Sequence, residues 1–157
     1  MKADAIIVLN SVLTKAVYLL YPLLLIYLAV YHLTDKEPGF VPALLVPGIS
    51  FVLVSVFRSK INAPRPYEMP GAKPPIIKKD APGKSFPSRH IFSIFVIAVT
   101  VFWVWPVPGV IIGIAGVVLA WSRVAGGVHF PRDVIAGALI GIGCGLIGYY
   151  VILPLIG

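Results

Sequence analysis

Long apolar stretches alternate with short polar segments along the chain, and their lengths predict membrane-spanning helices. A helix needs about 20 mostly apolar residues to cross the ~30 Å hydrocarbon layer of a bilayer. Three suitable stretches are Ala16–Leu33, Phe40–Phe57 and Val134–Leu153. A fourth, Ile91–Trp121, contains no charged residue, and Pro106-Val107-Pro108-Gly109 interrupts it. Because this tetrapeptide is typical of a turn, the fourth stretch predicts a helical hairpin, which makes five spans in all.

The region before the first span permits two interpretations. Its apolar character begins at Ala5, so residues 5–14 either extend the first span or form a separate interfacial helix, with Lys15 reaching toward the headgroups. We expect an all-α, polytopic membrane helical bundle of five spans, or of six helices if this segment is separate. Residues 1–157 are expected to form a single integral membrane domain.

The last span contains three glycines, each four residues from the next: Gly137, Gly141 and Gly145. This spacing places them on one face of a helix, where small residues let a second helix approach closely. We expect a packing seam within the chain in preference to a dimer interface.

Composition narrows the class of protein. Hydrophobic residues make up 59% of the 157 residues and charged residues only 12%, with a mean hydropathy of +0.96. Soluble domains usually carry about a quarter charged residues. The composition therefore excludes an ordinary soluble protein, and its apolar content also excludes a disordered chain. A single cysteine, Cys144, excludes an intramolecular disulfide and a metal site built from several cysteines.

The formal net charge of +7 is concentrated in two polar segments, Arg58–Arg89 and Arg123–Asp133. The predicted hairpin separates them, so both segments should lie on one side of the membrane. The N-terminus should share that side and the C-terminus should lie opposite. Basic residues that flank membrane spans, with few aromatic residues among them, make nucleic acid a poor candidate partner. They fit either a cytoplasmic anchor or an anion-binding site.

Residue identities favour the anion-binding site. Three clusters lie at the predicted membrane edge: Arg58-x6-Arg65-Pro66 with Lys60 inside it, Pro87-Ser88-Arg89-His90, and Ser122-Arg123-x5-His129-x3-Asp133. Arginine offers a planar set of donors that suits phosphate oxygens. Several such cations together would neutralise charge in a phosphoryl-transfer transition state. The helix start after Ser88 would add backbone N–H groups and a hydroxyl to this cradle.

The two histidines in these clusters could perform the chemistry. His129 and Asp133 are four residues apart, which is one turn of a helix. A carboxylate on one imidazole nitrogen leaves the other nitrogen available as a nucleophile. His90 could then serve as acid and base. Taken singly, each cluster is more often a helix cap or a surface pair, but their joint occurrence on one membrane face is hard to explain by packing.

The same segments argue against a resident metal ion and against ATP. Their acidic residues are only Glu68, Asp80 and Asp133, whereas metal-dependent phosphatases gather several carboxylates or histidines around their ions. No GxxxxGK[ST] loop is present to bind nucleotide phosphates. We therefore expect no cofactor.

With these motifs, the chain resembles the type 2 phosphatidic acid phosphatase family, membrane lipid phosphatases related to vanadium haloperoxidases. The family's motifs are K-x6-R-P, P-S-G-H and S-R-x5-H-x3-D, and this sequence carries all three in order between Arg58 and Asp133. The resemblance implies that His129 is a nucleophile forming a phosphohistidine, that Asp133 orients it, and that His90 is the acid and base. It also implies that the phosphoryl oxygens are bound by Arg65, Ser88 and Arg123, without any metal.

Three features depart from the family pattern. Arg58 replaces the usual lysine, and Lys60 could share its role. Arg89 replaces the glycine of P-S-G-H, where its side chain could add a cation to the site or project toward lipid headgroups. The family commonly has six spans, whereas five are counted here.

We therefore expect an integral membrane phosphatase acting on a phosphomonoester or diphosphate of a lipid. Candidate substrates are a polyprenyl diphosphate, a phosphatidylglycerol phosphate and a phosphatidate. The short chain is similar to bacterial undecaprenyl diphosphate phosphatases, and the resemblance implies a site on the outer face of a prokaryotic cell membrane. Two alternatives remain: a non-catalytic binder or transporter of anionic lipids, and a vanadate-dependent haloperoxidase.

Overall fold

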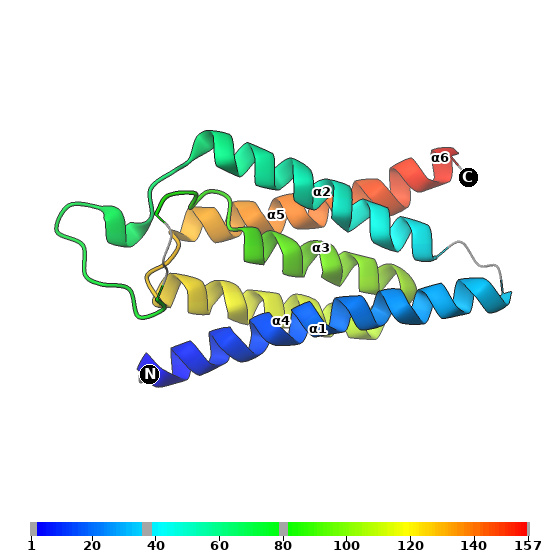
Figure 1. Ribbon diagram of the computed structural model, residues 1–157, viewed down its shortest axis with the longest axis horizontal. Helices are drawn as coiled ribbons and strands as arrows, with labels where there is room; N and C mark the ends of the chain where they lie inside the picture. The colour runs from blue at the N-terminus through cyan, green and yellow to red at the C-terminus, as the bar shows by residue number, and fades with distance from the viewer. Residues whose placement is uncertain (1–2, 36–38, 79–81, 157) are drawn as a thin grey trace.

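The computed structural model describes residues 3–35, 39–78 and 82–156, which form helices and loops without any strand. The long helices are α1 (Ala3–Asp35), α2 (Phe40–Ile61), α3 (Arg89–Val104), α4 (Pro106–Ala125) and α5 (Pro131–Ile147), shown in Figure 1. A 3₁₀ turn, η1 (Pro66–Glu68), lies between α2 and α3. After α5 the chain continues through a π-helical stretch, η2 (Gly148–Ile152), into α6 (Leu153–Ile156). The predicted all-α bundle is confirmed.

The lengths and surfaces of the helices fit a membrane. Among the described residues, α1, α2, α4 and the continuous α5–α6 region each include a window that is long and apolar enough to cross a bilayer, whereas α3 is a shorter apolar helix of 16 residues. Large apolar side chains such as Leu19, Leu53 and Leu139 are about two-thirds exposed on the outer faces of the bundle. Because soluble proteins rarely expose extended apolar surface, these faces are suited to contact lipid. The chain is an integral membrane protein.

The first helix settles the two interpretations of the N-terminal region. α1 is continuous from Ala3 to Asp35 and passes through Pro22, so residues 5–14 extend the first span. At 1.5 Å per residue, its 33 residues measure about 50 Å, which exceeds the hydrocarbon thickness. The separate interfacial helix is not formed.

The turn of the hairpin lies slightly before its predicted position. α3 ends at Val104 and α4 begins at Pro106, so the break falls at Trp105, whose backbone is extended. The predicted turn residues 106–109 instead form the first turn of α4. Proline is well suited to the first position of a helix, because the N–H group that it lacks would have no helical partner there.

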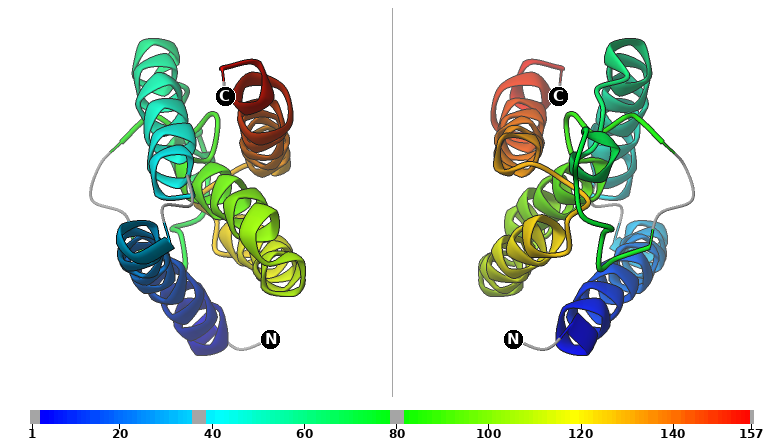
Figure 2. Two further views of the ribbon diagram at one scale, coloured as in Figure 1. Left: turned by 90° about the vertical axis from the view of Figure 1, so that its right-hand side faces the viewer. Right: turned by 90° about the vertical axis from the view of Figure 1, so that its left-hand side faces the viewer.

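The glycine seam lies within the chain, as predicted. A Cβ atom on Gly137, Gly141 or Gly145 would come within 2.6–2.7 Å of atoms in the segment formed by Ser88 and α3. The glycines therefore allow α3 and α5 to pack closely. Figure 2 shows α3 in the middle of the bundle, where it contacts each of the other four long helices. This packing fixes the start of α3 beside the start of α5.

Both polar loops lie at one end of the bundle. The loop from α2 to α3 and the loop from α4 to α5 lie at the same end as the N-terminus, and the C-terminus lies at the opposite end (Figure 1). This arrangement is the predicted one. The end formed by residues 62–78, 82–88 and 126–130 is called the polar end below.

Candidate active site

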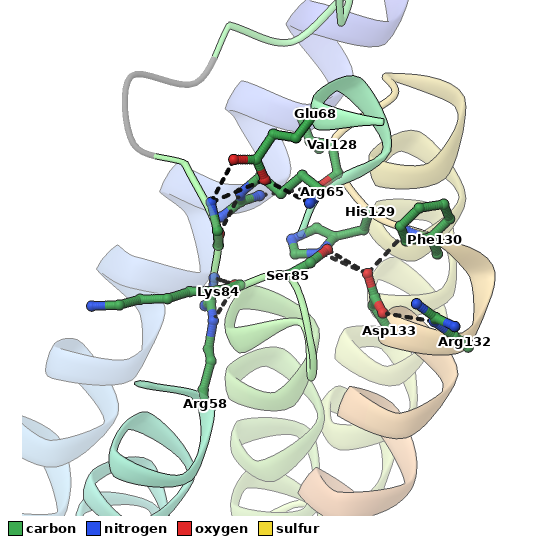
Figure 3. Close-up of polar contacts among 11 residues, drawn as sticks. Arg58, Arg65, Glu68, Lys84, Ser85, Val128, His129, Phe130, Arg132 and Asp133 are labelled. Atoms are coloured by element: carbon green, nitrogen blue, oxygen red, sulfur yellow. Dashed lines mark hydrogen bonds and ion pairs between the residues drawn. The ribbon is translucent and has the colours of Figure 1, made fainter. Parts of the chain in front are cut away.

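Segments that are far apart in the sequence meet at the polar end (Figure 3). The last turn of α2 supplies Arg58, and the following loop supplies Arg65. His129 lies just before α5, and Asp133 lies in its first turn. The backbone N–H of Ser88 donates to the carbonyl of Asp133 at 2.9 Å, which ties the start of α3 to the start of α5.

His129 and Asp133 are buried side by side, as their spacing predicts. His129 is 2% exposed and Asp133 is fully buried, and Nδ1 of the ring lies 3.6 Å from Oδ2 of the carboxylate. Oδ2 also accepts hydrogen bonds from the Ser85 hydroxyl at 2.5 Å and from the backbone N–H of Phe130 at 3.0 Å. A carboxylate in the first turn is well placed beside the positive end of the α5 dipole. The start of α5 thus holds the carboxylate against the ring.

The contacts of His129 assign its tautomer. Because the Ser85 hydroxyl donates to Asp133, its oxygen presents a lone pair to Nδ1 at 3.4 Å. A proton on Nδ1 therefore faces two acceptors, and Nε2 keeps its lone pair. Burial lowers the pKa of His129 to about 4, assisted by the charges of Arg65 and Arg123 and opposed by Asp133. The ring is therefore neutral at pH 7, the state that a nitrogen nucleophile requires.

We expect the His129 imidazole to stay neutral as the pH falls from 7 to about 5. Its titration midpoint should lie near pH 4, well below the ordinary value of about 6.5. Nitrogen-15 NMR of histidine-labelled protein would measure the midpoint, with the His129 signal identified by its loss in His129→Gln. The unfolded chain binds this proton more readily, so stability should decline as the pH falls from 6.5 toward 4. A midpoint at or above 6.5 would contradict this account.

Backbone carbonyls at the polar end hold the guanidinium groups of Arg58 and Arg65. Arg58 donates through Nε and Nη2 to the carbonyl of Lys84, with Nε at 2.5 Å. Arg65 donates through Nε to Gly83 at 2.9 Å and through Nη1 to Val128 at 3.0 Å. A guanidinium carries five N–H donors, so both arginines keep donors beyond those that these carbonyls receive. The bonds orient the arginines while leaving capacity for phosphoryl oxygens.

A carboxylate fastens the loop that supplies the Gly83 and Lys84 carbonyls. Glu68 accepts hydrogen bonds from the backbone N–H of Arg65 at 2.6 Å and from that of Gly83 at 2.9 Å. Gly83 has a φ of +65°, in the left-handed region that favours glycine. The loop therefore folds back over the end of α2, where it closes one side of the site.

A cavity of about 350 Å³ lies in front of the histidine ring. Six of its lining side chains can carry positive charge or transfer protons: Arg58, Arg65, Lys84, Arg89, His90 and His129. None of the described residues that line it is acidic. His90 also packs against the edge of the Tyr18 ring, with ring centroids 6.1 Å apart. An anion that entered this cavity would meet both histidines and several cations at once.

Three of the predicted binding residues lie outside the lining of this cavity. Ser88 is fully buried, and its hydroxyl has no hydrogen-bond partner among the described residues. Arg123 is buried and donates through Nη2 to the Thr14 hydroxyl at 3.3 Å. Lys60 is exposed, because two residues along a helix turn a side chain by about 200°, away from Arg58. The structure thus brings Arg58 to the site and leaves Lys60 outside it.

Ser85 is a site residue that the sequence analysis missed. It is fully buried and bonded to Asp133, yet it lies in an irregular loop where no periodicity marks it. The available signal was its position two residues before Pro87, in the same short segment as the second motif. Thr14 was also missed, because its contact with Arg123 joins residues 109 positions apart.

In the part of the chain that the structure describes, no group of three or more His, Cys, Asp or Glu side chains could hold a metal ion. Asp80, one of the three acidic residues noted in the polar segments, lies outside the described residues.

Sequence comparisons relate the chain to known membrane proteins. It is 30% identical over 146 residues to the bacitracin transport permease protein BcrC of Bacillus licheniformis, which covers 84% of this chain and 68% of that protein. It is 45% identical over 62 residues to YbjG of Escherichia coli K12, whose name proposes an undecaprenyl-diphosphatase activity. This second match covers 38% of this chain and 31% of YbjG.

Solved structures share the fold. LpxE of Aquifex aeolicus matches with a TM-score of 0.68 and 28% identity over 90% of this chain and 85% of that one. A PAP2-type phosphatidylglycerolphosphate phosphatase of Bacillus subtilis matches with a TM-score of 0.67 and 27% identity over 93% and 80%. The family model described as the PAP2 superfamily matches residues 39–156, which include all three motifs. The chain therefore belongs to the PAP2 superfamily, as an integral membrane protein related to its phosphatases.

Proposed function

We propose that the chain hydrolyses the phosphomonoester or diphosphate headgroup of a membrane lipid through a phosphohistidine on His129. The proposal rests mainly on the position of His129. Its ring is buried, and Asp133 faces its Nδ1 atom. The same ring lines a cationic cavity at one end of the membrane bundle. A neutral imidazole with Nε2 unprotonated is a competent nucleophile toward phosphorus.

In the first step, Nε2 of His129 attacks the phosphorus atom and forms a P–N bond. The bond from phosphorus to the leaving oxygen breaks, and its electron pair stays on that oxygen. His90, which lines the same cavity, donates the proton that the leaving oxygen needs. Arg58 and Arg65 stabilise the charge on the phosphoryl oxygens, and the charge of Arg123, which acts on His129, adds to the positive potential of the site.

In the second step, water attacks the phosphorus of the phosphohistidine. His90, now without its proton, takes one from the water, and the P–N electron pair returns to Nε2. Asp133 stabilises the positive charge that His129 carries in the intermediate, since Oδ2 faces the Nδ1 proton. The products are inorganic phosphate and the lipid with one phosphoryl group fewer, and the enzyme returns to its starting state.

The position of the site supports a lipid substrate. The cavity lies at the polar end of helices whose outer faces are apolar. A lipid headgroup can therefore reach His129 while its tail stays in the bilayer. Of the related proteins, YbjG carries undecaprenyl-diphosphatase in its name, and the Bacillus subtilis structure is titled as a phosphatidylglycerolphosphate phosphatase. Both names support phosphorylated lipids as the substrate class.

The function can be tested by measuring phosphate release in detergent micelles from a prenyl diphosphate, a phosphatidylglycerol phosphate and a phosphatidate. We expect release from at least one of them, and the same rate with and without EDTA, because the proposed steps use protein side chains alone. No release from any of the three would overturn the phosphatase proposal. Peroxide-dependent halide oxidation after vanadate loading, without phosphatase activity, would identify a haloperoxidase.

We also propose that the polar end faces outward from the cell. Basic loops usually face the cytoplasm when they serve only to orient a membrane protein. Here Arg58, Arg65 and Lys84 line the cavity, so phosphate binding can account for their charge instead. The same assay tests the orientation in right-side-out vesicles without detergent. An outward site releases phosphate into the external medium, whereas an inward site retains it in the lumen.

A further inference from the structure

Positive charge lies at two different depths around the cavity. The Arg58 guanidinium is bonded to the loop carbonyl of Lys84, at the polar end. The Arg89 guanidinium instead lies over the ring of Phe51, with its central carbon 5.6 Å from the ring centroid. Phe51 precedes Arg58 by two turns on α2, which is about 10 Å along the helix axis. The cavity thus has Arg58 and other cations on its loop side and Arg89 on its membrane side.

An unpartnered hydroxyl lies between these two levels. Ser55 is four residues after Phe51 and three before Arg58, so the three share one face of α2. Ser55 lines the cavity, and its hydroxyl oxygen is buried without a hydrogen-bond partner among the described residues. Because a buried hydroxyl without a partner is costly, this position favours a ligand that accepts a hydrogen bond.

An apolar groove is linked to the polar cavity through side-chain contacts. Its volume is about 310 Å³, and side chains of α1, α2 and α3 line it, Tyr18 and Phe51 among them. These two side chains also contact residues that line the polar cavity, because Tyr18 packs on His90 and Phe51 packs under Arg89. A lipid whose tail lay in this groove would place its tail-side phosphoryl group beside Arg89.

We propose that the site is built for a lipid diphosphate, with Arg89 and Ser55 binding the tail-side phosphoryl group. The outer phosphoryl group then lies against His129, Arg58 and Arg65. This inference rests on the proposed phosphatase function and names its substrate class. The cavity volume of about 350 Å³ equals the share of about a dozen liquid waters, which leaves room for two phosphoryl groups.

The position of Arg89 also has a chemical consequence. Attack by His129 breaks the bond between the outer phosphorus and the bridging oxygen, and the electron pair goes to the bridging oxygen. The leaving group is a lipid monophosphate, whose growing negative charge lies beside the Arg89 guanidinium. A phosphomonoester has no tail-side phosphoryl group, so Arg89 cannot assist its cleavage in the same way. Arg89 should therefore determine the preference for diphosphate over monophosphate.

The test compares two substrates with the same tail, farnesyl diphosphate and farnesyl monophosphate. We expect Arg89→Gln to lower kcat/KM for the diphosphate by about 10- to 100-fold, the usual range for a lost charge-assisted hydrogen bond. The value for the monophosphate should change by less than about threefold. Ser55→Ala should lower the diphosphate value by a smaller factor, and Arg89→Lys should restore part of it. Lys73→Gln removes an exposed loop charge away from the cavity and is the matched control.

The possible outcomes separate this inference from the general function. An equal loss of kcat/KM on both substrates in Arg89→Gln would overturn the diphosphate inference. Hydrolysis of the monophosphate alone by the wild-type protein would overturn it too. In both cases the proposed phosphatase activity would still stand. If the wild-type protein released phosphate from neither farnesyl substrate but did so from phosphatidate, the diphosphate assignment alone would fall. If no phosphorylated lipid were hydrolysed, the proposed function would fall with it.

Discussion

Replacing His129 by alanine should reduce phosphate release by roughly 10⁴-fold or more, the scale on which enzymes lose activity without their nucleophile. His129 Nε2 is the atom proposed to bond to phosphorus, and Asp133 faces the other nitrogen of the same ring and orients it. Inorganic phosphate measured from the detergent-solubilised protein gives the result. Activity near that of the wild type would overturn the covalent mechanism.

A second measurement separates lost chemistry from lost folding. His129 is buried, so alanine leaves a void, whereas His129→Gln retains much of the volume and a polar group toward Asp133. Both variants should be inactive, and His129→Gln should keep a thermal unfolding midpoint closer to that of the wild type. Acid-labile, alkali-stable radioactive phosphate should be trapped on the wild-type protein and be absent from both variants. Label retained on either variant would assign the nucleophile to another residue.

Replacing His90 by alanine should lower turnover of an alkyl phosphate or diphosphate by about 10²- to 10⁴-fold, the usual contribution of a general acid–base residue. The loss has two sources, because His90 is proposed first to protonate the leaving oxygen and then to activate water. A substrate with a good leaving group, such as p-nitrophenyl phosphate, needs only the second action. With that substrate the variant should form the phosphohistidine and then stall.

The predicted signature is a rapid burst of about one p-nitrophenol per active site, followed by slow turnover. Stopped-flow absorbance would record it, and the trapped phosphoprotein should accumulate in parallel. His90→Gln is the companion variant, because it preserves packing beside Tyr18 but cannot transfer a proton. If the variants lost equal activity on good and poor leaving groups and showed no burst, His90 would have a structural role instead.

Much of the fold could be predicted from local properties of the chain. The length and the apolar character of a stretch determine whether its helix can cross the bilayer, and both are set by residues adjacent in the sequence. The all-α bundle, the hairpin and the glycine seam all followed from such local patterns and are confirmed. The hairpin turn was misplaced by about one residue because Pro106 both interrupts an apolar run and starts a helix well.

The candidate site could be predicted only as a set of residue types. The His129–Asp133 contact was predictable because one helical turn spans it. The choice between Arg58 and Lys60 was not, since it depends on how α2 is rotated against the loop that supplies the Lys84 carbonyl. Ser85 has no marking pattern of its own, and only the fold shows that it bonds Asp133.

By itself, the amino-acid sequence determined that this protein is a helical membrane protein. It also identified the polar residues that could bind a phosphoryl group or react with it. Those properties depend on composition and on short spacings. The bilayer thickness is enough to interpret the apolar stretches, and the helix repeat is enough to interpret the spacings. The tertiary structure alone decided which side chains share the cavity, and at what depth. Arg89 lies over Phe51 and Arg123 reaches Thr14 through the packing of different helices. Such contacts arise from the relative rotation and height of segments that are distant in the sequence.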